Sequence, residues 1–182
     1  MNKKQHKYFV RLLLILFIIL FTVFLVYYRD KIKSFGIYGY PGIFILSFLA
    51  NATLIFPLPG VIMTSAFGMV FNPAGVAIAA ASGASLGELT GYAAGYSGSF
   101  VVENKEWYDR VKEWMTKSGE VIVFTMAIIP NPLFDLAGIA AGTLKMPLIK
   151  FLAWCWLGKL LKMLLFAYTG KTLLTLFSSL FQ

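Results

Sequence analysis

The chain has 182 residues, of which 59% are hydrophobic and 13% charged, and its mean hydropathy is +0.76. This composition is too apolar for an ordinary soluble domain and predicts an all-α integral membrane protein. The net charge of +8 would suit nucleic acid, but the basic residues lie at the ends of apolar runs, as expected for anchors beside lipid headgroups. We therefore expect membrane phospholipids as partners and no nucleic acid.

The first segment, 1–35, contains a basic tail followed by the apolar run 12–28. No small-x-small cleavage site follows this run; Tyr27 and Tyr28 do, and such rings favour the headgroup level. We interpret the segment as an uncleaved signal-anchor helix. We expect a prokaryotic cytoplasmic membrane, with the N-terminus in the cytoplasm.

The segment 36–100 is predicted to hold a first repeat. Its apolar run is interrupted by Pro57 and Pro59, and this P-x-P spacing does not fit one straight helix. Non-helical backbone in lipid must be covered by protein, so we predict a re-entrant hairpin, with two short crossings as the alternative. Asn51-Ala52-Thr53 matches a glycosylation pattern but lies inside this apolar run, so we discount it.

A crossing helix is predicted over 74–100, which is rich in small residues and contains no proline. Glycines recur at every fourth position and form a stripe that another helix backbone can approach closely: Gly83, Gly87, Gly91 and Gly95. The next segment, 101–119, interleaves charges with apolar residues at helical spacing, which predicts an amphipathic helix in the membrane interface.

The last segment, 120–182, is predicted to be a second repeat with its own break and crossing helix. The break is Pro130-Asn131-Pro132, and a further apolar run, 148–168, follows Met146-Pro147. Four ordered matches join the two repeats at offsets of 73, 74, 71 and 72. They pair Pro57 and Pro59 with Pro130 and Pro132, Gly68 and Pro73 with Gly142 and Pro147, Leu86-Gly87-Glu88 with Leu157-Gly158-Lys159, and Tyr96-Ser97-Gly98 with Tyr168-Thr169-Gly170.

The relative orientation of the repeats depends on the hairpins. If each hairpin re-enters, one crossing helix separates the units, and they are inverted about a pseudo-two-fold axis in the membrane plane. If the hairpins cross, the units are parallel.

Charged residues at membrane depth are costly, so each needs a reason. Glu88 and Lys159 occupy matching places in the two repeats, while Asp135 follows the second break and Lys162 lies one turn beyond Lys159. One reading is that Glu88 and Lys159 pair to hold the halves together. The other is a polar track, or a protonatable set of groups, in a cavity between the repeats.

Enzymatic chemistry finds little support, and we expect neither a cofactor nor a metal. His6 is the only histidine and Cys155 the only cysteine, so a Ser-His-Asp triad or a His- or Cys-based metal site cannot form within one chain. The glycines form no phosphate-binding loop.

The stretch 128–162, IIPNPLFDLAGIAAGTLKMPLIKFLAWCWLGKLLK, resembles the VTT domain of DedA-type bacterial membrane proteins and eukaryotic vacuole membrane protein 1. P-N-P-L-F-D-L-A-G followed by G, P and L-G-K is closest to the vacuole membrane protein 1 branch. The resemblance implies two re-entrant hairpins in inverted repeat. It also implies lipid movement between leaflets: scrambling in the eukaryotic branch, and translocation of undecaprenyl phosphate or phosphatidylethanolamine in the bacterial one.

The family's intramembrane acidic residues correspond here to Glu88 and Asp135. DedA-type proteins usually carry arginines where this chain has Ala127 and Leu133, which weakens the proton-coupled reading. We therefore expect an energy-independent lipid scramblase with a polar groove between the hairpins. The alternatives are a proton-coupled translocase of a lipid-linked phosphate or small solute, and a non-transporting scaffold; self-association is left open.

Overall fold

A computed structural model describes residues 39–52, 60–98, 104–130 and 133–180, together with isolated positions between 16 and 31. The signal anchor predicted for 1–35 is described only at those isolated positions. Pro57, Pro59, Asn131 and Pro132 lie outside the described residues, and Pro130 follows the end of a helix. The re-entrant geometry of the two hairpins therefore stays a prediction.

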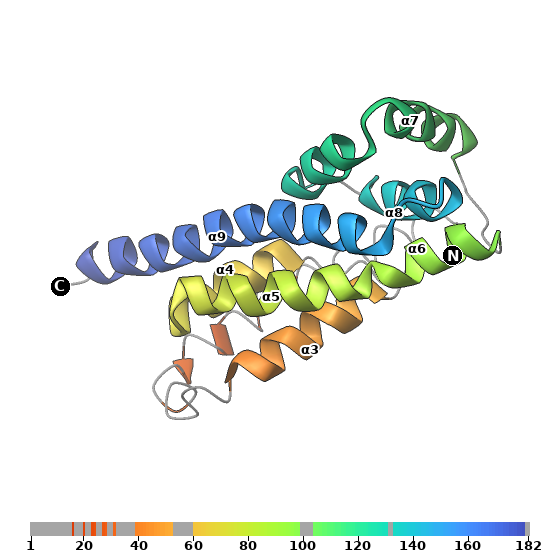
Figure 1. Cartoon of the computed structure of the whole chain (residues 1–182). Coiled ribbons are helices and arrows are strands. Elements are labelled where there is room, and N and C mark those ends of the chain that lie inside the picture. The colour runs from red at the N-terminus through yellow and green to blue at the C-terminus, as the bar shows by residue number, and fades with distance from the viewer. Residues whose placement is uncertain are drawn as a thin grey trace, which may run out of the picture.

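The four continuous ranges are helical and contain no strand, which confirms the all-α prediction (Figure 1). The helices are α3 (Gly39–Ala52), α4 (Gly60–Val70), α5 (Pro73–Gly87), α6 (Leu89–Ser97), α7 (Lys105–Ile128), α8 (Phe134–Thr143) and α9 (Leu148–Leu180). In these parts of the chain, no helix is both long and apolar enough to cross a membrane.

Helix boundaries follow local chemistry. The Asn72 side chain accepts hydrogen bonds from the backbone N–H groups of Ala74 and Gly75, at 3.0 and 3.3 Å, and Pro73 supplies the first helical turn of α5. Asn104 caps α7 by accepting from Trp107 N at 3.1 Å. Gly98 ends α6 with φ 72°, the left-handed conformation that glycine adopts without strain.

Helix α7 bends at Ser118, whose φ and ψ are −154° and 64°, so the amphipathic part and the apolar part have different directions. The apolar residues of the first part divide into two groups. Tyr108, Val111 and Met115 are buried in the protein core with residues of α8 and α9, whereas Trp107 and Trp114 are exposed. Much of the amphipathic pattern is therefore explained by packing within the protein.

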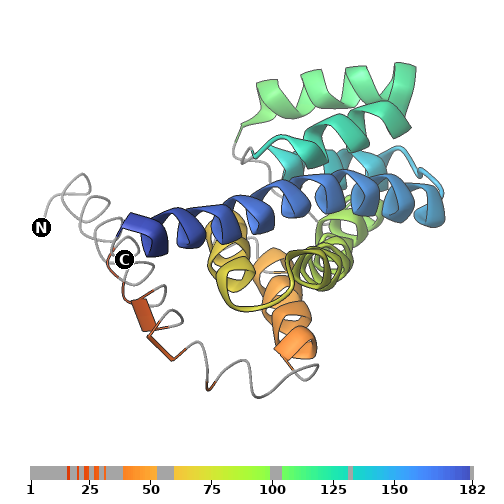
Figure 2. The ribbon, with the colours of Figure 1, turned by 90° about the vertical axis from the view of Figure 1, so that its left-hand side faces the viewer.

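The helices are arranged around α5 and α9, which pack against each other along the middle of the molecule. Helix α3 covers α5, α4 packs on α9, and α8 packs on both α6 and α7. Figure 2 shows α9 running between α7 on one side and the group α3, α4 and α5 on the other. The two larger buried clusters lie around α7, α8 and the first part of α9, and around α3, α5 and the later part of α9, and a small third one lies on α4.

The glycine stripe predicted over α5 and α6 is confirmed as a site of close helix approach. Gly83 lies against the Phe44 carbonyl of α3, and Gly95 against the Ile139 carbonyl of α8. A Cβ at either glycine would overlap the opposing backbone. The stripe thus serves two partners, with its first half on α3 and its second half on α8.

Corresponding glycines make corresponding contacts in the two halves of the chain. A Cβ on Gly87 would meet atoms of α3, namely Phe48 O, Asn51 Cβ and Ala52 N. A Cβ on Gly158 would meet atoms of α7, namely Phe124 O, Ala127 Cβ and Ile128 N. Each α3 residue precedes its α7 counterpart by 76 positions. Likewise Gly68 of α4 lies against α9 and Gly142 of α8 against α6.

Candidate functional site

Glu88 lies at the junction of α5 and α6. Its φ and ψ of −65° and −13° are near helical values, and i to i−4 hydrogen bonds run through it, from Glu88 N to Ala84 O at 3.2 Å and from Tyr92 N to Glu88 O at 3.1 Å. The segment predicted as one helix over 74–100 is thus α5 and α6 joined by a single irregular residue. This irregularity falls at the one carboxylate of the segment.

Glu88 and Lys159 form an ion pair in the interior, with 2.6 Å between Oε1 and Nζ. Their side chains are only 5% and 4% exposed. Lys159 Nζ also donates to Asn51 Oδ1 of α3 at 2.8 Å and lies 4.9 Å from the centre of the Phe134 ring. A single buried charge is strongly unfavourable, whereas a paired and hydrogen-bonded one can be tolerated. The contacts therefore join α3, the α5–α6 junction, α8 and α9 at one point.

Asp135 and Lys162 lie around this pair and are partly buried. Asp135 is in the first turn of α8, next to Phe134, and close enough to Glu88 and Lys159 to interact electrostatically with both. Lys162 interacts in the same way with Lys159 and Glu88. The structure thus brings together the four charged residues that the sequence singles out, which we call the seam cluster: Glu88, Asp135, Lys159 and Lys162.

Two further polar side chains border the seam cluster. Ser85 lies one turn before Glu88, and its buried Oγ is next to the Cys155 thiol. Cys155 lies one turn before Lys159, is buried, and is a free thiol. Within the residues that the structure describes, no group of His, Cys, Asp and Glu side chains could hold a metal ion.

Asn51 and Phe134 make contacts in this cluster that the sequence does not predict. Asn51 is a polar residue within a long apolar run, the same property that singled out Glu88, but its match to a glycosylation pattern led us to set it aside. The contact of Phe134 with an ammonium group has no sequence signature, because it depends on how α8 packs on α9.

These features define an α-helical bundle with a charged cluster enclosed where its helices meet. The chain belongs to the VTT domain family, whose family model matches residues 58–172. The matched range includes α4 to α8, most of α9 and the whole seam cluster. The family is generally membrane-associated and is proposed to be transporter- or scramblase-like. Comparisons with the curated proteins and with the solved structures found no match.

Proposed function

We propose that this protein is an integral membrane lipid scramblase that moves phospholipids between leaflets without an energy source. The observation that carries the proposal is the seam cluster: two carboxylates and two amines enclosed between helices of a very apolar chain. A headgroup that crosses the hydrocarbon needs polar groups along its way, while its tails stay in lipid.

The Glu88–Lys159 pair suits a path that opens and closes. A zwitterionic headgroup carries both a phosphate and an ammonium. The ammonium can replace Lys159 as the partner of Glu88, and the phosphate can replace Glu88 as the partner of Lys159. When the helices separate at the seam, the carboxylate and the amine exchange their mutual contact for the headgroup. This exchange avoids leaving either charge bare in a low-dielectric interior.

An inverted repeat with two re-entrant hairpins is part of the proposal. The corresponding contacts of Gly87 and Gly158 support it, as does the mirrored pattern in which α4 packs on α9 and α8 on α6. In such an arrangement the breaks face each other near the midplane, with the seam cluster beside them. We further propose that the chain resembles the vacuole membrane protein 1 branch and acts in a prokaryotic cytoplasmic membrane.

A scaffold is the second candidate, and the enclosure of the ion pair favours it. Because Lys159 satisfies both Glu88 and Asn51 within hydrogen-bond distance, the three side chains could serve only to fasten α3, the α5–α6 junction and α9. A proton-coupled translocase is the third candidate, with Asp135 and Glu88 as proton sites.

Flux measurements on purified protein separate the three. The full chain is reconstituted in liposomes with dye-labelled phospholipid, and a membrane-impermeant reductant bleaches the dye in the outer leaflet. We expect bleaching to continue into the inner-leaflet pool, at the same rate with and without a pH gradient. Flux only with a gradient would select the coupled translocase, and a stable inner-leaflet pool would select the scaffold.

Variants of the seam cluster complete this assay. Asp135→Ala and Glu88→Ala should abolish flux, and for the proposal to stand both must still insert into the membrane and be recovered as folded protein. Arg110→Ala is the matched control, because it removes an exposed charge of α7 that lies outside the cluster. Loss of folded protein in both cluster variants would support the scaffold.

A further inference from the structure

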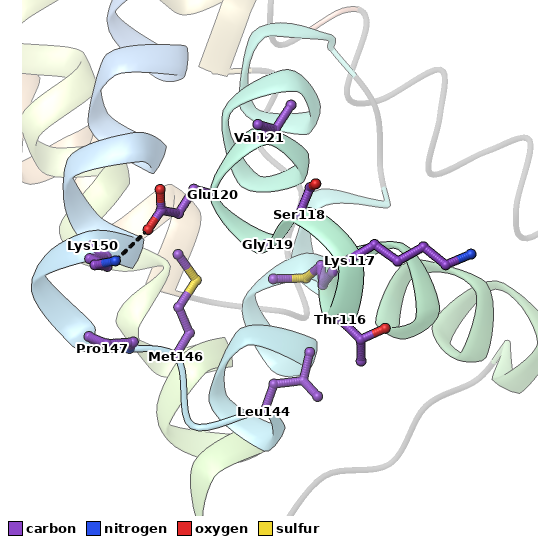
Figure 3. Close-up of a pocket in the computed structure, with 11 residues that line it drawn as sticks. Thr116, Lys117, Ser118, Gly119, Glu120, Val121, Leu144, Met146, Pro147 and Lys150 are labelled. Carbon is purple, nitrogen blue, oxygen red and sulfur yellow. Dashed lines mark hydrogen bonds and ion pairs between the residues drawn. The ribbon is translucent and has the colours of Figure 1, made fainter.

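A cavity of about 630 Å³ lies where α7 bends and α9 begins. Its lining includes Met115, Ser118, Glu120, Leu144, Met146 and Lys150 (Figure 3). This volume falls within the range of about 300–1,000 Å³ that is usual for small-molecule sites. The seam cluster contributes no residue to the lining, so the cavity is a separate feature.

Two opposite charges face each other in this cavity. Lys150 Nζ of α9 lies 2.7 Å from Glu120 Oε1 of α7, and the two side chains are 60% and 40% exposed. Figure 3 shows them pointing toward each other, with Met146 beside them, whereas Lys117 points away. An ion pair as exposed as this one contributes little stability, so a ligand can separate its partners at low cost.

The remaining lining combines the polar residues Thr116, Lys117 and Ser118 with apolar, adaptable side chains. Met115, Leu144 and Met146 place two thioethers and one branched chain around the ion pair. Methionine side chains are unbranched and adjust to irregular shapes. The cavity therefore offers an ion pair with apolar side chains beside it.

The corresponding corner of the first half is filled. With the offset of 76 that relates α3 to α7, Glu120 corresponds to Phe44 and Gly119 to Ile43, which is buried. Tyr40 contacts Phe71 there, with 5.7 Å between ring centres, and its ring lies directly against Gly75.

The bend at Ser118 explains why the second corner is open. Helix α3 continues without a bend to Gly39 and so places Tyr40 in its corner, whereas α7 changes direction one residue before Gly119. Lys150 corresponds to Val76 when counted from the proline that starts each helix. The corner of the first half is thus filled by apolar side chains, and that of the second half has a cavity with a separable ion pair.

We propose that this cavity binds the headgroup of a zwitterionic phospholipid, with the phosphate at Lys150 and the ammonium at Glu120. The identification of the ligand as a membrane lipid rests on the proposed function. The charges match a ligand that carries both signs, and the thioethers and Leu144 can contact the glycerol carbons. Lys112, Lys117 and Lys145 near the same end of the molecule agree with a position at headgroup level.

Methyl NMR on the full chain in detergent tests the proposal. With ¹³C-methyl methionine, the Met115 and Met146 signals report the cavity directly. Dihexanoyl-phosphatidylethanolamine and glycerophosphoethanolamine should both shift these signals with saturation. Inorganic phosphate, ethanolamine and glycerophosphoglycerol, at the same concentrations, should not.

Variants of the lining sharpen the test. Glu120→Gln and Lys150→Gln should each weaken binding about tenfold, the equivalent of one lost favourable contact. Glu106→Gln and Arg110→Gln remove the other exposed 2.7 Å ion pair of α7 and should leave binding unchanged. Gly119→Ile introduces the side chain that Ile43 has in the filled corner and should abolish the shifts. An added Cβ there meets only Met146 Sδ, at 3.8 Å, so the variant fits the backbone.

Several results would overturn the proposal. Equal shifts with phosphate or with glycerophosphoglycerol would show that the cavity does not recognise a zwitterion. Binding of the free headgroup without the diacyl lipid would remove the lipid as ligand. Flux in liposomes with no saturable shift would remove this site but keep the proposed function. Saturable shifts without flux would support this site and overturn the proposed function.

Discussion

Lys159 is the residue on which the interior charges depend. Its ammonium contacts a carboxylate of the α5–α6 junction, an amide of α3 and a ring of α8, so a single side chain of α9 joins three other parts of the fold. Removing one partner of such a pair leaves the other charge buried, which costs about 3–5 kcal/mol. The stabilising and the functional roles of the pair therefore need separate measurements.

Exchanging the charges of Glu88 and Lys159 separates the stabilising role from the functional one. Glu88→Lys and Lys159→Glu should each lower the thermal unfolding temperature, because each places like charges together, and the double variant should recover most of the loss. The double variant should still move lipid more slowly than the unmodified chain, since Asp135 then neighbours a differently placed amine. Full recovery of both stability and flux would indicate a fastening role alone. Thermal unfolding in detergent and the liposome assay supply the two readings.

At the scale of the helices, small residues set the distances between axes. Gly83 and Gly87 bring α5 onto α3, while Gly95 and Gly142 bring α6 and α8 together. Close approach allows backbone atoms of neighbouring helices to touch, which provides packing energy where both sides are small. The approach of α5 to α3 also brings Asn51 beside Gly87, the residue before Glu88.

Two glycines of α6, one turn apart, give a matched prediction. Gly95→Ala should destabilise the protein by about 1–3 kcal/mol, because the new methyl overlaps the Ile139 carbonyl of α8. Gly91→Ala should be neutral or stabilising, because its Cβ would lie 3.7 Å from the nearest atom, Asp135 O, and alanine is the better helix former. Thermal unfolding of the two variants tests this, and equal losses would contradict the close α6–α8 packing.

At the scale of the whole molecule, the two halves differ in how their matching corners are completed. The first corner has aromatic side chains from α3 and from the residue that follows α4, and the second has a bend in α7, an ion pair and a cavity. In the duplication that we propose, the helix contacts are kept while one corner opens, so the two ends of the molecule differ. In the inverted arrangement, that end lies on one side of the membrane.

Single cysteines at corresponding corners test the inversion. In a Cys155→Ala background, cysteines at Asn72 and at Lys145 should react with a membrane-impermeant maleimide from opposite sides of the membrane. The unmodified chain, whose only thiol is the buried Cys155, should stay unlabelled until it is denatured. Reaction of both positions from the same side would show parallel units and remove the inverted repeat.

Much of the seam cluster could be predicted from the sequence. The four charged residues are conspicuous because a charge is unfavourable in an apolar run. The matches between the two halves also place Glu88 and Lys159 at corresponding positions. Asn51 and Phe134 are not predicted, because Asn51 is considered only as part of a discounted glycosylation pattern and Phe134 has an ordinary apolar side chain. The amphipathic stretch 101–119 was assigned to the interface, yet Tyr108, Val111 and Met115 pack inside the protein, since periodicity cannot distinguish lipid from a neighbouring helix.

The sequence by itself determined the helical class, the family and the set of charges, because these depend on composition, local spacing and the cost of polar groups in apolar surroundings. Only the tertiary structure decided that Lys159 also bonds to Asn51, that the glycine stripe divides between α3 and α8, and that a cavity opens at the bend of α7. Each of these depends on how distant segments meet, and a one-residue change in helix direction, as at Ser118, is enough to separate a filled corner from an open one.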